Sequence, residues 1–210
     1  MNTQSSWPAR LTRSIAGQVK RHRTKSDISA QQLSEACAKL GLEIPRSTIA
    51  DLENGRRASI SVAELLVLAR ALGVAPLLLV FPVGSEAESE VLPGELRSPF
   101  RAALWAAGEA PFPGPDDAAY ITSITEDWNA ATANPLALYR AHLAASASAM
   151  RALGRARAMD ERAVGAAAGE REGFTEAAAA LRETAERHQA AADSTLRRAA
   201  ELGLVAPESM

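Results

Sequence analysis

Residues 44–57 gather hydrogen-bonding side chains within one short stretch of the chain. They read IPRSTIADLENGRR, with one arginine near the beginning and two at the end. A guanidinium carries five donors in a planar fork, which suits paired acceptors on an anion or on the edge of a heterocycle. The stretch holds no histidine, cysteine or lysine. Its arginines and small polar side chains suit recognition by hydrogen bonds and charge.

The spacing within this stretch predicts a short helix. Pro45 suits a first helical turn, and Gly55 suits the positive φ that ends a helix. At about 100° per residue, Ile49 and Leu52 share one face. The other face carries small and polar residues: Ser47, Ala50, Asp51 and Asn54. A helix this short with so thin an apolar stripe is unstable alone, so neighbouring helices must hold it.

The flanking segments predict two such neighbours. Ser29 followed by Gln32, and Ser61 followed by Glu64, have the spacing of capping boxes, in which two side chains satisfy orphan backbone amides. Gly41 predicts the end of the earlier of these helices. Apolar steps of four over residues 11–23 predict a helix before them, and the apolar segment 76–82 predicts a short one after them.

The three stretches ISAQQLSEACAKLG, IPRSTIADLENGRR and SVAELLVLARALGV, in this order, resemble the Cro/repressor helix-turn-helix family (XRE family, lambda-repressor-like) over residues 10–82. The Ala- and Arg-rich, Lys-poor composition is similar to that of actinobacterial members. The resemblance implies a five-helix DNA-binding domain in residues 1–82, a double-stranded DNA operator as partner and no cofactor. Extra residues between Leu33 and Ile49 depart from the commonest pattern and predict a longer second helix with an altered turn.

A recognition helix over residues 45–54 would place its first residues at base edges in the major groove. The base-reading residues would be Arg46, Ser47, Ala50 and Asp51. Arg46 can bond guanine O6 and N7, Ala50 offers a methyl to thymine, and Asp51 can accept from cytosine N4. For Asp51 an ion pair with a neighbouring arginine is an equally good interpretation.

Phosphate contacts would supply most of the affinity. Arg56 and Arg57 follow the helix directly, and Gln31 lies near the start of the second helix. Thr48 and Asn54 complete the predicted phosphate set. Further basic residues, several of which can be plain solvated surface, are Arg10, Arg13, Lys20, Arg21, Arg23 and Lys25.

Charge divides the chain into two parts. Residues 1–82 carry 11 Lys and Arg against 6 Asp and Glu, a net +5, and residues 83–210 carry 12 against 19, a net −7. This asymmetry favours a basic binding module joined to an acidic body. Residues 83–117, rich in Pro, Gly and Glu, are expected to form a linker, although the segment PFRAALWAAGEAPF within them has helical spacing and could dock on either side.

Residues 118–210 predict an Ala-rich helical hairpin or bundle, so the whole chain is expected to be all-α. Asn134-Pro135 suits a helix start, and three glycines at 165, 169 and 173 mark a break between two helices. Two heptad runs predict the seam. The first is Leu136, Tyr139, Leu143, Ser146, Met150 and Leu153; the second runs at the same spacing from Phe174 to Leu202. This part would form a homodimer or sense an effector.

Enzymatic, metal and membrane functions find no support in the sequence. There is no G-x-G-x-x-G, G-x-x-x-x-G-K-[ST], H-E-x-x-H or G-x-S-x-G motif. Every lysine lies in residues 1–82, which excludes a serine–lysine self-cleaving body, and the single Cys37 favours a buried apolar role. No apolar run spans a membrane or forms a signal peptide.

We expect a cytoplasmic, nucleoid-associated regulator, most simply a repressor. The alternative is an antitoxin-like protein whose acidic residues 118–210 bind a protein partner.

Overall fold

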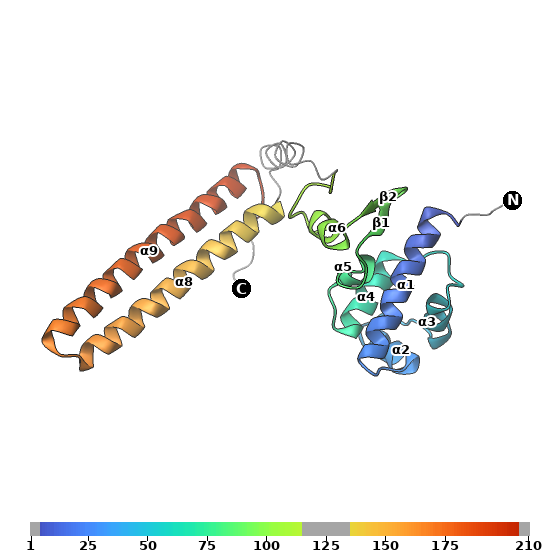
Figure 1. Cartoon of the computed structure of the whole chain (residues 1–210), viewed down its shortest axis with the longest axis horizontal. Coiled ribbons are helices and arrows are strands. Elements are labelled where there is room, and N and C mark those ends of the chain that lie inside the picture. The colour runs from blue at the N-terminus through green and yellow to red at the C-terminus, as the bar shows by residue number, and fades with distance from the viewer. Residues whose placement is uncertain (1–4, 115–134, 206–210) are drawn as a thin grey trace. The chain divides into compact units, whose positions relative to one another are not determined.

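The computed structural model describes residues 5–114 and 135–205. The chain divides into two compact units, Met1–Thr125 and Glu126–Met210. Helices dominate both units, as Figure 1 shows, and the described sheet consists of two short strands. The expectation of an all-α fold is confirmed, with this small sheet as an addition. No described helix is long and apolar enough to cross a membrane.

Five helices make up most of the first unit: α1 (Trp7–Lys25), α2 (Ala30–Lys39), α3 (Arg46–Glu53), α4 (Val62–Leu72) and α5 (Pro76–Val80). Helix α1 begins earlier than the predicted 11–23, and Pro8, whose fixed φ suits a first helical turn, lies at its start. Both predicted capping boxes are present. Ser29 and Ser61 each accept from the backbone amide three residues on, and the Gln32 and Glu64 side chains bond back.

The core of the first unit is built from large aliphatic side chains of all five helices. Its fully buried members include Val19, Leu33, Ile49, Leu68 and Leu79. Cys37 belongs to the same cluster, and burial raises the pKa of its thiol. Short helices that are weak alone are therefore held by burial of one apolar face each.

The predicted linker contains ordered elements that pack on this unit. Strands β1 (Ser89–Leu92) and β2 (Glu95–Arg97) pair antiparallel around Pro93-Gly94, where Gly94 has a φ of 78°. Helix α6 (Pro99–Ala106) follows, and its Ala102 is buried with Phe81 and Val91 in a second small core. Trp105 stacks edge-on against Phe112, with ring centroids 5.0 Å apart. The segment after residue 83 thus extends the first unit.

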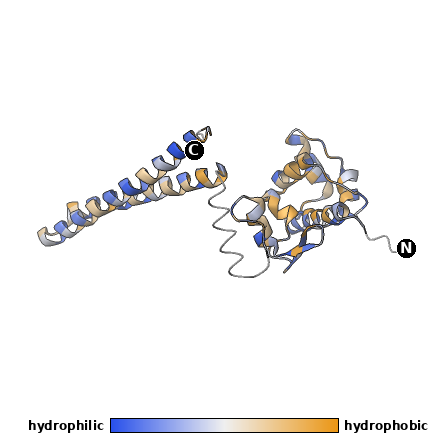
Figure 2. Ribbon diagram, turned by 90° about the horizontal axis from the view of Figure 1, so that it is seen from above, coloured by the Kyte–Doolittle hydropathy of each residue, from blue (hydrophilic) through white to orange (hydrophobic). Residues whose placement is uncertain are grey.

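The described part of the second unit is a helical hairpin of α8 (Pro135–Gly165) and α9 (Ala168–Glu201), which lie side by side (Figure 1). The break predicted from three glycines lies between Gly165 and Ala168, while Gly169 and Gly173 belong to α9. Asn134, the predicted start of the first hairpin helix, lies outside the described residues. Figure 2 shows hydrophilic stretches along the length of both hairpin helices, whereas strongly hydrophobic stretches gather in the first unit.

The buried residues of the hairpin seam are all alanines. On α9 the fully buried residues are Ala178, Ala185, Ala192 and Ala199, which belong to the predicted run. On α8 the prediction is wrong. The buried residues there are Ala149, Ala152, Ala156 and Ala163, whereas the predicted Leu143, Met150 and Leu153 are 38%, 67% and 43% exposed. Alanine against alanine lets the two backbones approach closely, which bulkier leucines would prevent.

Candidate nucleic-acid interface

Helix α3 presents one buried and one solvent-facing side. Ile49 and Leu52 are 0% and 2% exposed and fix the helix to the core. Arg46 and Ser47 at its N-terminal end are exposed, while Ala50 and Asp51 on the next turn are half-buried. The four predicted base-reading residues thus lie together at the N-terminal half of one helix.

The turn before α3 is held by a side chain of α2. Ser34 donates its hydroxyl to the backbone carbonyl of Ile44, with 2.7 Å between the oxygens. Ile44 itself is buried at 3% exposure, one residue before the Pro45 that precedes the helix. The start of α3 is therefore fixed by one hydrogen bond and one apolar anchor.

The loop after α3 is held by α1. Thr12 is 5% exposed, and its hydroxyl lies 2.8 Å from the Pro8 carbonyl and 3.2 Å from the Ala58 carbonyl. Gly55 takes a φ of 69° at the helix exit, as predicted. The Nε of Arg13 lies 4.0 Å from the point where a Gly55 side chain would begin. The exposed Arg13 therefore lies close to the C-terminal end of α3, where Arg56 and Arg57 follow.

A nearly buried ion pair joins α1 to the last residue of α3. The Arg23 guanidinium donates two hydrogen bonds of 2.7 Å to the two carboxylate oxygens of Glu53, and a third to the carbonyl of Ile28. The Arg23 and Glu53 side chains are 15% and 7% exposed. The hydrogen bonds to Glu53 raise the pKa of Arg23 against the opposing effect of burial. Such a bidentate pair fixes orientation as well as distance.

Arg56 and Asp51 form an exposed ion pair. Their closest atoms are 3.1 Å apart, and the two side chains are 72% and 45% exposed. The pairing of Asp51 with a neighbouring arginine, one of the two predicted interpretations, is therefore seen in the free protein. An exposed pair of this kind contributes about 0–1 kcal/mol, so it can exchange for another partner at little cost.

Arg57 is held more firmly than Arg56. It donates to both carboxylate oxygens of Glu64, at 2.7 and 3.3 Å, and its side chain is 27% exposed. The guanidinium of Arg57, together with the bonds from Ser61, holds the pKa of Glu64 below its usual range. Glu64 also closes the capping box of α4, so Arg57 is tied to the N-terminus of that helix.

The remaining predicted contact residues lie at the rim of α3. Gln31 is exposed and donates to Glu35 at 2.8 Å. Thr48 is half-buried, and Asn54 is exposed at the C-terminal end of the helix. Among residues 5–114 and 135–205, Arg46 has no side-chain hydrogen bond or ion pair, which leaves its guanidinium available. The structure brings all nine predicted residues to α3 or to the segments next to it.

The comparisons with known proteins agree with this geometry. Residues 19–79, which run from α1 into α5, match the helix-turn-helix family model. These residues form a helix-turn-helix domain of the Cro/repressor type. No curated protein and no solved structure matches the chain significantly. Domains of this kind bind DNA in transcriptional regulators, so the first unit carries the DNA-binding, helix-turn-helix part of a regulator.

Several residues that position the helix-turn-helix domain were not singled out from the sequence. Thr12, Ser34 and Glu53 fix α3 through partners that lie elsewhere in the chain. Arg23, predicted only as a further basic residue, pairs with Glu53. Arg23 and Glu53 are 30 positions apart. Local spacing signals such as a capping box extend over three or four residues, so no local pattern could have paired them.

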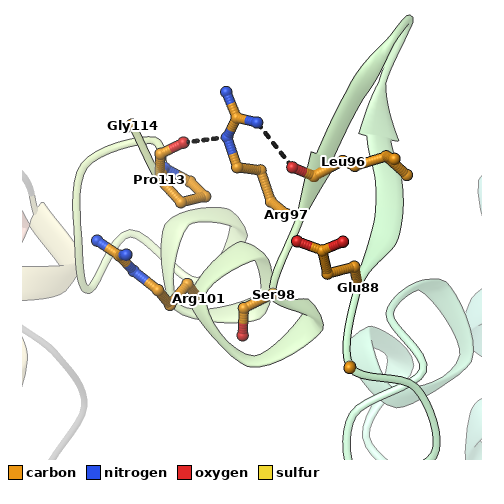
Figure 3. Close-up of a pocket in the computed structure, with 8 residues that line it drawn as sticks. Glu88, Leu96, Arg97, Ser98, Arg101, Pro113 and Gly114 are labelled. Carbon is orange, nitrogen blue, oxygen red and sulfur yellow. Dashed lines mark hydrogen bonds between the residues drawn. The ribbon is translucent and has the colours of Figure 1, made fainter. Parts of the chain in front are cut away.

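A polar hollow of about 460 Å³ lies beside β2 and α6 (Figure 3). Arg97 forms part of its wall and donates to the carbonyls of Pro113 and Leu96, each at 2.7 Å. This arginine therefore pins the segment after α6 to strand β2. Within the described ranges, no group of three or more His, Cys, Asp or Glu residues could hold a metal ion.

Proposed function

We propose that the chain is a sequence-specific transcriptional repressor that binds a double-stranded operator as a homodimer. The observation that carries the proposal is the way α3 is held. Ser34, Thr12 and Arg23 fix its two ends, while the first turn presents Arg46 and Ser47 to solvent. A helix fixed in orientation with an exposed polar end is what readout of base edges requires.

The base-reading set is Arg46, Ser47, Ala50 and Asp51. Arg46 is the strongest member, because its unengaged guanidinium can bond guanine O6 and N7 in a bidentate manner. Asp51 can contact a base only if it leaves Arg56, and the exposed pair makes that exchange inexpensive. Released in this way, Arg56 becomes available for a phosphate at the same moment.

The phosphate set is Gln31, Thr48, Asn54, Arg56 and Arg57. Arg57 plays its part as a charge near the backbone while it stays bonded to Glu64. A dimer would place two copies of α3 on half-sites about 34 Å apart, one helical turn of DNA. Repression needs only that the bound dimer occupy its site, so no activating contact with the transcription machinery is invoked.

Two arginine variants test the assignment. Arg46→Ala should relax preference at one base pair of each half-site and cost roughly 1–3 kcal/mol on the preferred sequence. Arg56→Ala should weaken binding to all sequences alike and flatten the dependence of affinity on salt. Fluorescence anisotropy with a preferred and a scrambled duplex, at two salt concentrations, separates these effects. An Arg46→Ala protein with unchanged sequence preference would contradict the base-reading role.

A second candidate function is the binding of a protein partner by the C-terminal half of the chain. Residues 83–210 carry a net −7, of which residues 83–117 supply −5 and residues 126–210 supply −2 with 12 Asp and Glu against 10 Arg, so charge gives only weak support to a cationic partner of the hairpin, as in an antitoxin. Stoichiometric co-purification of a basic protein that displaces the chain from DNA would favour that function. Isolation of a homodimer with full operator affinity would favour the repressor.

A further inference from the structure

Helix α1 begins well before the range that matches the helix-turn-helix family. The match starts at residue 19, whereas the helix starts at Trp7. Residues 7–18 therefore add about three helical turns in front of the matched domain. We name these residues the α1 extension. Ile15 and Ala16 of the extension are buried in the core of the five helices, so the extension is a packed part of the first unit.

Two polar contacts hold the α1 extension in place. Arg10 donates two hydrogen bonds of 2.7 Å to the two carboxylate oxygens of Glu90 on β1. On the next residues, the Thr12 hydroxyl lies 3.2 Å from the carbonyl of Ala58, which belongs to the loop after α3. The extension is thus fixed to the β-hairpin and to the loop that follows the recognition helix. Side chains of the extension therefore have a defined position relative to α3.

Arg13 is the cation that the α1 extension brings to α3. Its side chain is exposed, and its Nε lies 4.0 Å from the point where a Gly55 side chain would begin. Gly55 is the residue at the exit of α3, directly before Arg56. Within residues 5–114 and 135–205, no side-chain hydrogen bond or ion pair engages the Arg13 guanidinium. Its five donors are therefore available to an anion from outside the protein.

Two other arginines of α1 are engaged inside the protein. Arg10 and Arg23 each donate to both oxygens of one carboxylate, on Glu90 and Glu53 respectively. A phosphate could recruit either arginine only by breaking a bidentate pair and leaving a carboxylate beside the DNA. Arg13 has no such carboxylate partner in the described part of the chain. The structure thus separates Arg13 from the arginines that stabilise the fold.

The charge around the exit of α3 favours a further anion. Arg56 is paired with Asp51, and Arg57 is paired with Glu64. Arg13 lies beside these two pairs and adds a positive charge that neither carboxylate neutralises. Double-stranded DNA carries one negative charge per about 1.7 Å of its axis, and its phosphates line both edges of the major groove. A duplex that holds α3 in its groove therefore offers the anion that this exit lacks.

We infer that Arg13 is a phosphate-contacting residue, whose guanidinium binds the DNA backbone beside the exit of α3 together with Arg56. The planar fork of an arginine suits two oxygens of one phosphate. The inference rests on the proposed binding of double-stranded DNA and extends the phosphate set to a part of α1 outside the family match. Phosphate contacts carry no direct base information, so Arg13 adds affinity and register but no sequence preference.

The salt dependence of DNA binding by the full-length chain tests the inference. Arg13→Ala should make the slope of log K against log salt concentration shallower by about 0.9 for each chain bound. Its affinity should fall by the same factor for a preferred and a scrambled duplex, and Arg13→Lys should retain most of the slope. Arg70→Ala is the matched control, because Arg70 is exposed on α4, which packs mainly on α1, α2 and α5. A wild-type slope for Arg13→Ala would overturn the inference.

Ethylation interference locates the contact on the duplex. The wild type should show a phosphate near each half-site at which ethylation blocks binding, and Arg13→Ala should lose that interference while Arg70→Ala keeps it. The same interference pattern in all three proteins would contradict the inference, and circular dichroism checks that the variants stay helical. The salt test also uses the scrambled duplex. A wild type that binds it without any sequence preference would therefore defeat the proposed repressor alone, whereas an unchanged slope for Arg13→Ala would defeat the inference alone.

Discussion

The helices of the two units are packed together by side chains of opposite size. In the first unit the longest of the five helices has 19 residues and α3 has 8, and large aliphatic side chains hold them together. In the second unit α8 and α9 have 31 and 34 residues, and they meet through alanines. Helix propensity supports the long helices locally, whereas α3 depends on its neighbours.

The difference in packing corresponds to two structural requirements. A helix that reads bases must be fixed in orientation, and α3 is fixed by a buried apolar face, two hydroxyl contacts and a bidentate ion pair. Two long helices that pair along their length need small side chains at every turn of the seam instead. The contrast predicts that removal of one contact has a large effect in the first unit, and that added bulk has the larger effect in the hairpin.

Loss of the Glu53 carboxylate should have the largest effect on stability. Glu53→Ala leaves the nearly buried Arg23 guanidinium without its partner, which is expected to cost about 3–5 kcal/mol of the free energy of unfolding. Urea denaturation followed by tryptophan fluorescence measures it, since Trp7 and Trp105 both belong to the first unit.

Two controls make this test specific. In the hairpin, Glu183→Ala removes an exposed carboxylate 3.9 Å from Arg187 and should change stability by no more than about 0.5 kcal/mol. The double variant Arg23→Met with Glu53→Met replaces both charges by apolar chains and should regain much of the loss. If Glu53→Ala and Glu183→Ala lost equal amounts of stability, the contrast between the two units would be contradicted.

Added bulk in the alanine seam should have the next largest effect. Ala185 is 3% exposed between α9 and α8, so Ala185→Leu forces the helices apart and should destabilise the hairpin by about 1–3 kcal/mol. Thermal unfolding followed by circular dichroism reports the change. Ala190→Leu, on the exposed side of the same helix, should shift it little. A hairpin that tolerates leucine at Ala185 would contradict close alanine packing.

Acid should weaken the first unit modestly through Glu90. The Arg10 guanidinium and the Gly94 amide lower the pKa of Glu90 to about 2 from 4.5. A lowered pKa means that this stabilisation is fully present above about pH 4.5 and is lost as the pH falls toward about 2. Glu90→Gln should reduce that part of the acid dependence in urea denaturation. The nearby exposed Glu88→Gln is the control, and an identical pH profile for all three proteins would contradict the assignment.

Local signals in the first unit were sufficient to predict its helices. Both capping boxes and the glycine exits at Gly41 and Gly55 act over three or four residues, and each has the predicted geometry. The β-hairpin had a signal as well, since Pro93-Gly94 lies between short runs that can pair. Pro, Gly and Glu are so frequent in the whole segment that its composition predicts a linker instead.

Two features could not be obtained from the sequence in this way. The contacts that orient α3 join residues far apart, such as Thr12 with Ala58 and Arg23 with Glu53. On α8 two stripes share heptad spacing, so periodicity alone does not say which one faces α9. The size of Leu143 and Met150 predicts that their stripe is buried. The stripe that contains Ala149 and Ala156 is buried instead, because small side chains allow α8 to approach the alanines of α9 closely.

Selection of bound duplexes from a random oligonucleotide pool, with full-length protein at physiological salt, tests the central claim most directly. The claim is that an α3 fixed on the first unit reads base edges in two copies. The predicted result is an inverted repeat whose half-sites lie one helical turn apart, with preference lost at one base pair per half-site for Arg46→Ala. Salt-sensitive binding without any enriched sequence would contradict it.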